Sequence, residues 1–169
     1  MENRAELLRL LAELLEYPGP DLPARARQCE MLLTGRPEAA ATMKDFAAFA
    51  GAEDQGRLEE IYTSSFDLNP QCYPYAGYQL FGEDPKRSEL MIGLQQSFCA
   101  RGFNAGTELP DHVPLLLRFL SELDDPEMER ELRDLVLSPC LAKMAKTLEE
   151  KNNPYAKAVS AALSVISIP

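Results

Sequence analysis

The stretch of sequence that says most about the fold spans residues 108–123 and reads Glu108-Leu109-Pro110-Asp111-His112-Val113-Pro114-Leu115-Leu116-Leu117-Arg118-Phe119-Leu120-Ser121-Glu122-Leu123. From Val113 onward, apolar residues recur at three- and four-residue spacing, which is typical of an amphipathic helix. Pro114 falls within the first turn of that helix, where a proline is tolerated. The stretch therefore predicts a polar loop that leads into a buried helix.

Two polar residues stand at the predicted start of this helix. Asp111 precedes it, where a carboxylate can accept backbone N–H bonds as an N-cap and complement the helix dipole. The ring of His112 could face solvent, pair with Asp111 or hydrogen-bond to the loop. Local chemistry alone favours a capped helix with an exposed histidine. A polar loop directly before such an apolar helix is also compatible with a binding role.

Helical periodicity extends outward from this segment over nearly the whole chain. An N-terminal leucine stripe ends at Tyr17-Pro18-Gly19-Pro20, and residues 67–75, with two prolines, predict an ordered loop. Further helices are expected over 22–33, 38–50, 58–66, 86–101, 113–123, 127–137 and 139–151, with a last one opened by Asn153-Pro154. Residues 78–81 add only a short helical segment. No strand-like alternation appears. The prediction is an all-α, single-domain bundle of about eight or nine helices over residues 1–169.

The charge balance restricts the partners. The net charge is −10 at pH 7, which disfavours nucleic acid because phosphate binding needs clustered Lys and Arg. An acidic surface favours basic ligands, although charge taken alone is also explained by solubility. No apolar run approaches a membrane span, and charged residues near the N-terminus exclude a secretory signal there. We therefore expect a cytoplasmic protein.

Residues that support catalysis or metal binding are sparse. Cys29, Cys72, Cys99 and Cys140 are far apart and form no CxxC pair, so they are expected to be free, mostly buried thiols. His112 is the only histidine, whereas nucleophilic catalysis and di-iron bundles both need histidine at defined positions. The sequence predicts no enzyme activity, no metal site and no cofactor.

The segment 108–123 resembles the signature of the redox-enzyme maturation chaperones, the family of the TorD, DmsD and NarJ proteins. Upstream, Leu58-Glu59-Glu60-Ile61-Tyr62-Thr63-Ser64-Ser65-Phe66-Asp67 resembles the Tyr-x-x-x-Phe-Asp segment of that family. Tyr73-Pro74-Tyr75 and Tyr78-Gln79-Leu80-Phe81-Gly82 stand where its tyrosine- and proline-rich loop lies. The spacing is nearer the NarJ side, which includes the delta subunit of respiratory nitrate reductase. Gly82-Glu83-Asp84-Pro85 lacks the histidine motif of that branch, which leaves the client enzyme open.

The resemblance implies a specific role. Such chaperones bind the N-terminal peptide of the apo catalytic subunit of a molybdopterin oxidoreductase, often a twin-arginine signal, and hold it during cofactor insertion before export or membrane docking. The positions that match the family and are expected to bind the peptide are Tyr62, Phe66, Asp67, Tyr78, Phe81, Glu108, Asp111, His112 and Pro114. For Tyr62, Phe66 and Phe81, ordinary core packing is at least as good an interpretation.

Two further points stay open at the level of sequence. The oligomeric state can be a monomer or a domain-swapped dimer. The alternative function from another class is a permanent structural accessory subunit of a respiratory oxidoreductase complex. A large isolated apolar patch would favour that alternative, whereas a narrow groove rimmed with acidic residues would favour a transient peptide.

Overall fold

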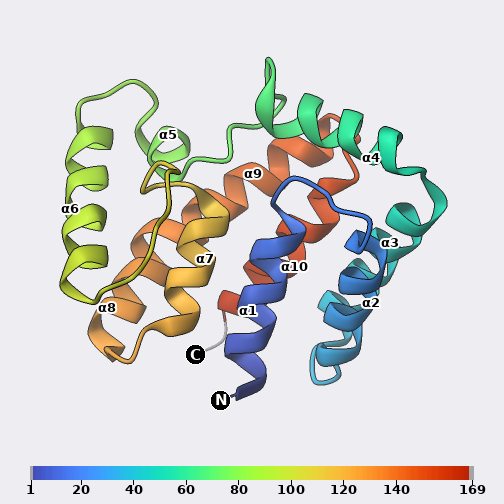
Figure 1. The fold of residues 1–169 in the computed structure, drawn as a ribbon, viewed down its shortest axis with the longest axis horizontal. Helices are drawn as coiled ribbons and strands as arrows, with labels where there is room; N and C mark the ends of the chain where they lie inside the picture. The colour runs from blue at the N-terminus through green and yellow to red at the C-terminus, as the bar shows by residue number, and fades with distance from the viewer. Residues whose placement is uncertain (1, 168–169) are drawn as a thin grey trace.

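A computed structural model of the chain describes residues 2–167, and within this range the polypeptide is helical apart from its loops (Figure 1). The elements are α1 (Glu2–Leu14), α2 (Leu22–Leu32), α3 (Pro37–Ala52), α4 (Gln55–Tyr62), η1 (Thr63–Asp67), α5 (Ala76–Phe81), α6 (Lys86–Ala100), α7 (Val113–Glu122), α8 (Pro126–Glu131), η2 (Leu132–Leu137), α9 (Ser138–Glu150) and α10 (Tyr155–Ile166). The described residues contain no strand, only an isolated antiparallel bridge between Tyr75 and His112. The all-α prediction is confirmed.

The two segments labelled η are π-helical and continue their neighbours without a break. Because α4 runs into η1, and α8 runs through η2 into α9, residues 2–167 form nine continuous helical stretches. This number lies within the expected eight or nine.

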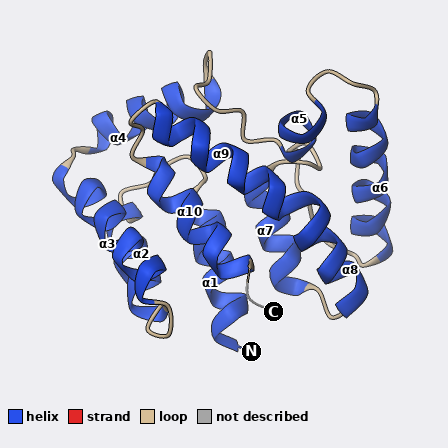
Figure 2. Cartoon of the chain, turned by 180° about the vertical axis from the view of Figure 1, so that it is seen from behind, coloured by secondary structure: helices blue, strands red, loops and turns tan. Residues whose placement is uncertain are grey.

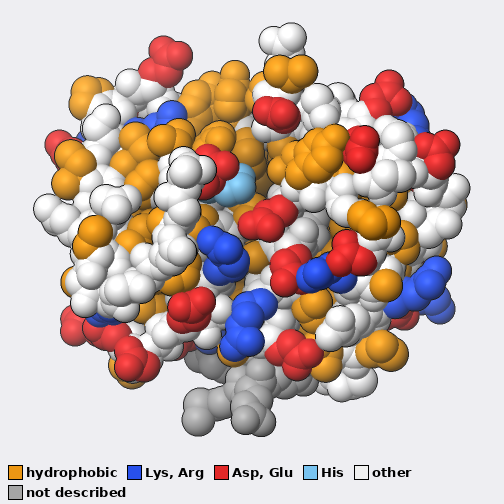
Figure 3. All heavy atoms as spheres, in the orientation of Figure 1, with side chains coloured by type: hydrophobic (Ala, Val, Ile, Leu, Met, Phe, Trp, Pro, Cys, Tyr) orange, Lys and Arg blue, Asp and Glu red, His pale blue; other side chains and the backbone are white. Residues whose placement is uncertain are grey.

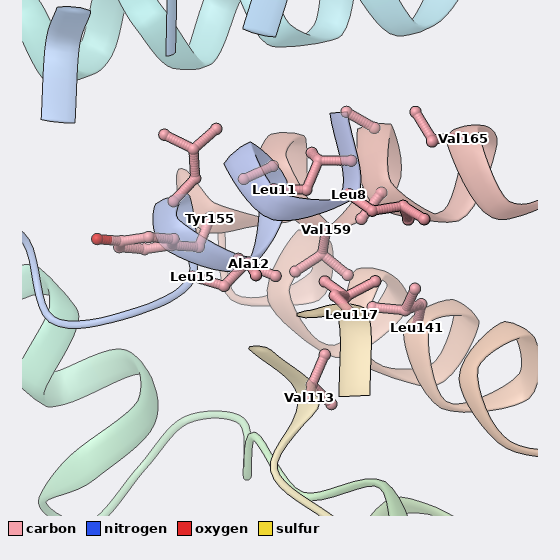
Figure 4. Close-up of a cluster of buried hydrophobic side chains, with 14 of the residues drawn as sticks. Leu8, Leu11, Ala12, Leu15, Val113, Leu117, Leu141, Tyr155, Val159 and Val165 are labelled. Atoms are coloured by element: carbon pink, nitrogen blue, oxygen red, sulfur yellow. The ribbon is translucent and has the colours of Figure 1, made fainter. Parts of the chain in front are cut away.

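The core forms around α1, which packs against α7 on one side and α10 on another. Figure 4 shows Leu8, Leu11 and Ala12 of α1 facing side chains of α7, α9 and α10. Leu11 and Ala12 are completely buried, and each fully buried leucine contributes about 1.5–3 kcal/mol. The buried apolar residues form one continuous cluster, which makes α1 the central helix of the bundle.

The remaining helices extend this core in two directions. The α2–α3 pair packs on α1 and α10 at one end of the molecule, and α5, α6 and α8 lie at the other end (Figures 1 and 2). Figure 2 shows α8 and α9 following one line across the back of the molecule. Within residues 2–167, no helix is both long enough and apolar enough to span a lipid bilayer.

The continuous α8–α9 stretch corrects the expectation of two separate helices divided at Ser138-Pro139. A proline inside an α-helix clashes with the carbonyl four residues earlier. Here η2 precedes the proline, and the Ser138 N–H reaches back to the carbonyl of Arg133 in a π-type hydrogen bond. The wider π turn shifts the carbonyl register, and the chain passes Pro139 without leaving the helical path.

The cysteines are all free thiols, as expected, and only Cys99 is exposed. Burial raises the pKa of Cys29 to about 12 and that of Cys72 to about 11, so both stay protonated and poorly nucleophilic at neutral pH. Among residues 2–167, no three His, Cys, Asp or Glu side chains are grouped to hold a metal ion.

Tyr155 opens α10 in the middle of an aromatic cluster and is completely buried. Its ring centroid lies 5.0 Å from that of Phe66, 5.4 Å from Phe46 and 6.0 Å from Tyr62. Its hydroxyl has no hydrogen-bond partner among the described residues. The ring therefore stabilises the core, while the hydroxyl carries the desolvation cost of an unpaired polar group.

We expect Tyr155→Phe to leave the free energy of unfolding unchanged or to raise it by about 1 kcal/mol, because it removes an unpaired buried hydroxyl. Tyr155→Ala should lower it by about 3–5 kcal/mol, because it leaves a cavity. Urea denaturation of the two variants measures both values. A large loss in Tyr155→Phe would show that the hydroxyl has a partner in solution.

Candidate functional site

The carboxylate of Asp111 is completely buried, and it joins two helices that precede it in the chain. Its Oδ2 accepts a hydrogen bond from the backbone N–H of Gly77 in α5 (3.1 Å) and pairs with Nε of Arg87 in α6 (3.0 Å). A Cβ at residue 77 would lie 2.7 Å from the same oxygen, so this approach requires glycine.

The prediction that Asp111 caps α7 is therefore wrong. His112 occupies the N-cap position and makes no side-chain capping bond. The Asp111 carboxylate is already engaged with α5 and α6, and a fully buried carboxylate gains more from a guanidinium partner than from a helix end.

Backbone hydrogen bonds then fix the two loops that meet at this point. The Ala76 N–H donates to the carbonyl of Asp111 (2.7 Å), and the Val113 N–H donates to the carbonyl of Pro74 (2.9 Å). The short antiparallel bridge between Tyr75 and His112 results, and it brings their ring centroids to 5.3 Å. The loop of residues 67–75 is thus anchored to the start of α7.

His112 is not the exposed residue expected from the sequence, since its side chain is only 11% exposed. Burial lowers the pKa of His112 below its ordinary value of 6.5; nearby Glu108 and Asp111 oppose this shift, and Arg118 adds to it. The Nδ1 atom lies 3.9 Å from Oε2 of Glu108. The imidazole is therefore predominantly neutral at pH 7.

A pocket of about 330 Å³ opens beside His112. Figure 3 shows this face of the molecule, with the pale blue histidine at the bottom of a hollow bordered by apolar and acidic side chains. The lining residues come from the turn after α1, from α4 and η1, from both anchored loops and from α7: Glu16, Tyr17, Tyr62, Phe66, Asp67, Pro74, Tyr75, Glu108, His112, Leu115 and Arg118.

Five of the nine residues singled out from the sequence lie together in this pocket: Tyr62, Phe66, Asp67, Glu108 and His112. Tyr62 and Phe66 also belong to the core, with 8% and 5% exposure, and their ring centroids are 5.4 Å apart. The two interpretations of these aromatic residues are therefore compatible, because both residues belong to the core and also line the pocket.

The other four lie elsewhere. Tyr78 stacks on Tyr73, with ring centroids 4.1 Å apart, and lies beneath the guanidinium of Arg87. Phe81, at the end of α5, is 37% exposed and outside the pocket. Asp111 and Pro114 are buried, so neither side chain is open to a ligand in this structure.

Several pocket residues were not singled out from the sequence, chiefly Tyr17, Tyr75, Leu115 and Arg118. Tyr17 could have been identified from the sequence. It is an aromatic residue that directly follows a leucine-rich helix, and that helix cannot bury its ring. Leu115 and Arg118 follow His112 at three-residue spacing and so share its side of α7. This spacing predicts that Leu115 and Arg118 line the pocket only if His112 is already known to line it.

The pocket is acidic at the end where its aromatic residues gather. Burial raises the pKa of Tyr62, and the charges of Glu16 and Asp67 raise it further, with smaller contributions from Tyr75 and Glu108. The Tyr75 hydroxyl donates to Oε1 of Glu108 (3.2 Å), and burial followed by the Glu108 charge raises the pKa of Tyr75 to about 12. Both phenols are neutral donors at pH 7, facing carboxylates that favour a cationic ligand.

We expect Asp111→Ala to lower the free energy of unfolding by about 2–4 kcal/mol, because it leaves Arg87 without its partner. Asp111→Asn should cost less, since its amide oxygen can still accept from Gly77. A matched control is Asp125→Ala, because Asp125 does cap α8 through the Glu127 and Met128 N–H groups, and its loss should cost about 1 kcal/mol. Urea denaturation at pH 7 distinguishes the two roles; equal losses for Asp111→Ala and Asp125→Ala would contradict this assignment.

The lowered pKa of His112 makes stability dependent on pH. The unfolded chain takes up a proton at His112 more readily than the folded chain does. The contribution of neutral His112 to the free energy of unfolding is therefore complete above pH 6.5. It is lost as the pH falls from 6.5 toward the pKa of His112 in the folded protein. We expect the difference in unfolding free energy between wild type and His112→Gln to be constant above about pH 7 and to shrink in acid. Urea titrations across this range measure it, and a difference independent of pH would contradict the expectation.

The chain is similar in sequence to known proteins. The family model described as nitrate reductase delta subunit matches residues 30–161. The chain is 27% identical over 161 residues to the nitrate reductase molybdenum cofactor assembly chaperone NarJ of Escherichia coli strain K12, and equally to that of strain O157:H7. The match covers 88% of this chain but 64% of those relatives, so the chain spans less than two thirds of their length.

A solved structure is also similar. A crystal structure from Archaeoglobus fulgidus, described as a redox enzyme maturation protein, superposes with a TM-score of 0.67 at 26% sequence identity, covering 96% of this chain and 93% of that one. The family model and the shared fold confirm the resemblance noted in the sequence, and the chain belongs to the nitrate reductase delta subunit family.

Proposed function

We propose that this chain is a cytoplasmic assembly chaperone, one domain over residues 1–169, that binds the N-terminal, twin-arginine-type peptide of the catalytic subunit of a molybdenum-containing oxidoreductase. It holds the apo subunit during cofactor insertion, before export or membrane docking, and acts as a monomer or a domain-swapped dimer. The observation that carries the proposal is the acidic, aromatic-walled pocket beside His112.

The charges of the pocket complement a basic peptide. Glu16, Asp67 and Glu108 come from three different segments and line one pocket with a single guanidinium, that of Arg118. Arginine side chains bind carboxylates in a paired, directional geometry. Carboxylates that converge from separate segments therefore suit an arginine-containing peptide better than a diffuse acidic surface would.

The walls of the pocket suit the apolar part of such a peptide. Tyr62, Phe66 and Leu115 line the pocket beside the carboxylates. The ring of Tyr17, which also lines it, is 57% exposed and offers apolar surface. Aromatic residues provide large contact area at low entropic cost, and an amphipathic peptide helix laid in a groove uses this combination.

The relatives support the same role. The two E. coli proteins are named as molybdenum cofactor assembly chaperones for nitrate reductase, and the A. fulgidus protein is described as acting in redox enzyme maturation. A molybdenum oxidoreductase is accordingly the proposed client.

One feature favours the alternative function, that of a permanent accessory subunit of a respiratory complex. A second, mainly apolar hollow of about 280 Å³ lies between α6 and η2. Leu135 at its edge is 68% exposed, and Ile92 on α6 is 59% exposed. A permanent interface would bury such residues.

The leader peptide of a molybdenum oxidoreductase encoded in the same genome should bind with a Kd of about 1 µM or tighter in calorimetry. Glu108→Gln and Asp67→Asn should each weaken binding about tenfold, because each removes a carboxylate that faces the peptide. Glu150→Gln on the exposed end of α9 is the control, with the same change in net charge outside the pocket.

Absence of heat and of a thermal shift with several such leaders would refute the peptide-binding function. Stoichiometric co-purification with the mature oxidoreductase, stable in high salt, would then establish the accessory-subunit role instead.

A further inference from the structure

Arg118 differs from every other half-buried arginine in residues 2–167, because its guanidinium lies over the ring of Phe103 and has no hydrogen-bond or ion-pair partner. The others are Arg4 and Arg25, paired with Glu129 and Glu13; Arg87 and Arg133, paired with Asp111 and Asp134; and Arg36, which donates to the carbonyls of Ser164 and Val165. The Arg118 side chain makes no hydrogen bond or ion pair with a described residue, and its Nε is buried without an acceptor. A half-buried guanidinium without an acceptor is unfavourable in the free protein.

The position of Arg118 separates it from the pocket carboxylates. His112, Leu115 and Arg118 line the pocket from α7 at three-residue spacing. Six residues of helix place Arg118 about 9 Å along the axis from His112. Glu108 lies at the His112 end, 3.9 Å from its Nδ1, whereas the Arg118 guanidinium lies 6.0 Å from the ring centroid of Phe103. The pocket therefore has an acidic end and a basic end.

The surroundings of Tyr62 agree with this polarity. Burial, Glu16, Asp67 and Glu108 all act to raise the pKa of Tyr62. The three carboxylates thus act together on the Tyr62 phenol. None of the three lies within ion-pair distance of Arg118, although all four line the same pocket.

We propose that Arg118 is a specificity residue, and that the pocket selects a peptide helix carrying an acidic side chain two turns away from a basic one. The basic side chain binds at the Glu108 end and the acidic one pairs with Arg118. Residues seven apart lie on the same face of a helix, about 10.5 Å apart along its axis, which is close to the rise of about 9 Å between His112 and Arg118 along α7. The inference rests on the proposed peptide-binding function and adds the charge pattern that the peptide needs.

Affinity for such a peptide depends on Arg118 in two ways. A peptide with only basic side chains is attracted by Glu108 at the acidic end of the pocket. The guanidinium of Arg118 repels its basic side chains at the other end. A peptide with an acid at the matching position replaces that repulsion with a charge-assisted, bidentate pair in a partly desolvated pocket. The same residue therefore rejects one class of leader and accepts another.

The test uses synthetic amphipathic peptides that share an Arg-Arg pair and an apolar run of Leu and Phe. Two place a Glu seven residues before or after the pair, on the same helix face. A third moves the Glu to five residues from the pair, onto the opposite face with the composition unchanged, and a fourth carries Gln instead. Calorimetry measures each Kd with wild type, Arg118→Gln and the control Arg130→Gln, which removes an exposed positive charge on α8.

Wild type and Arg130→Gln should bind one of the seven-residue peptides about tenfold more tightly than the opposite-face and Gln peptides. Arg118→Gln should bind all four alike, with a melting temperature no lower than that of wild type. Arg118→Glu should reverse the preference, toward a peptide with Lys at the matching position.

Equal affinities of wild type for all four peptides, or a preference that survives in Arg118→Gln, would overturn the role of Arg118 and leave the peptide-binding function standing. Failure of every peptide to bind wild type, together with failure of the leader peptides, would overturn both.

Discussion

The buried carboxylate of Asp111 is the interaction on which the pocket depends. It holds the N-terminal turn of α5 through Gly77 and the first turns of α6 through Arg87, and its own backbone carbonyl receives the N–H of Ala76. Three segments that are distant in the sequence therefore meet at one oxygen pair. Without it, the loop that carries Tyr75 would lose its anchor beside His112, and one wall of the pocket with it.

The opposite wall depends on a different feature, the π turn at the end of α4. Tyr62 closes α4 and Phe66 lies within η1, so both aromatic rings pack on Tyr155 of the core. Asp67, one residue further, is then exposed at the rim. A π turn at such a place is often associated with function, because the extra residue per turn redirects side chains that a regular α-helix would bury. Core packing and ligand contact are thus combined in the same short segment.

The electrostatic character of the pocket follows from these two supports. The carboxylates of Glu16 after α1, Asp67 in η1 and Glu108 in the loop before α7 line one pocket because the loops are anchored. Arg118 lines the same pocket because α7 continues past His112. In the proposed function this pocket attracts a basic peptide, and in the proposed role of Arg118 its guanidinium limits which basic peptides fit. This combination is well suited to a chaperone that recognises the leader of one enzyme among many similar leaders.

The sequence by itself determined the helical elements, the all-α class, the family resemblance and five of the pocket residues, because helix periodicity and local motifs are short-range properties of the chain. Even so, the junction at Pro139 and the role of Asp111 were wrong in the sequence interpretation. Only the tertiary structure paired Asp111 with Gly77, 34 residues away, and with Arg87, 24 residues away, and only it placed Tyr17 and Arg118 in the same pocket. Contacts at such separations depend on how the helices pack, and a buried charge takes whichever partner that packing brings within reach.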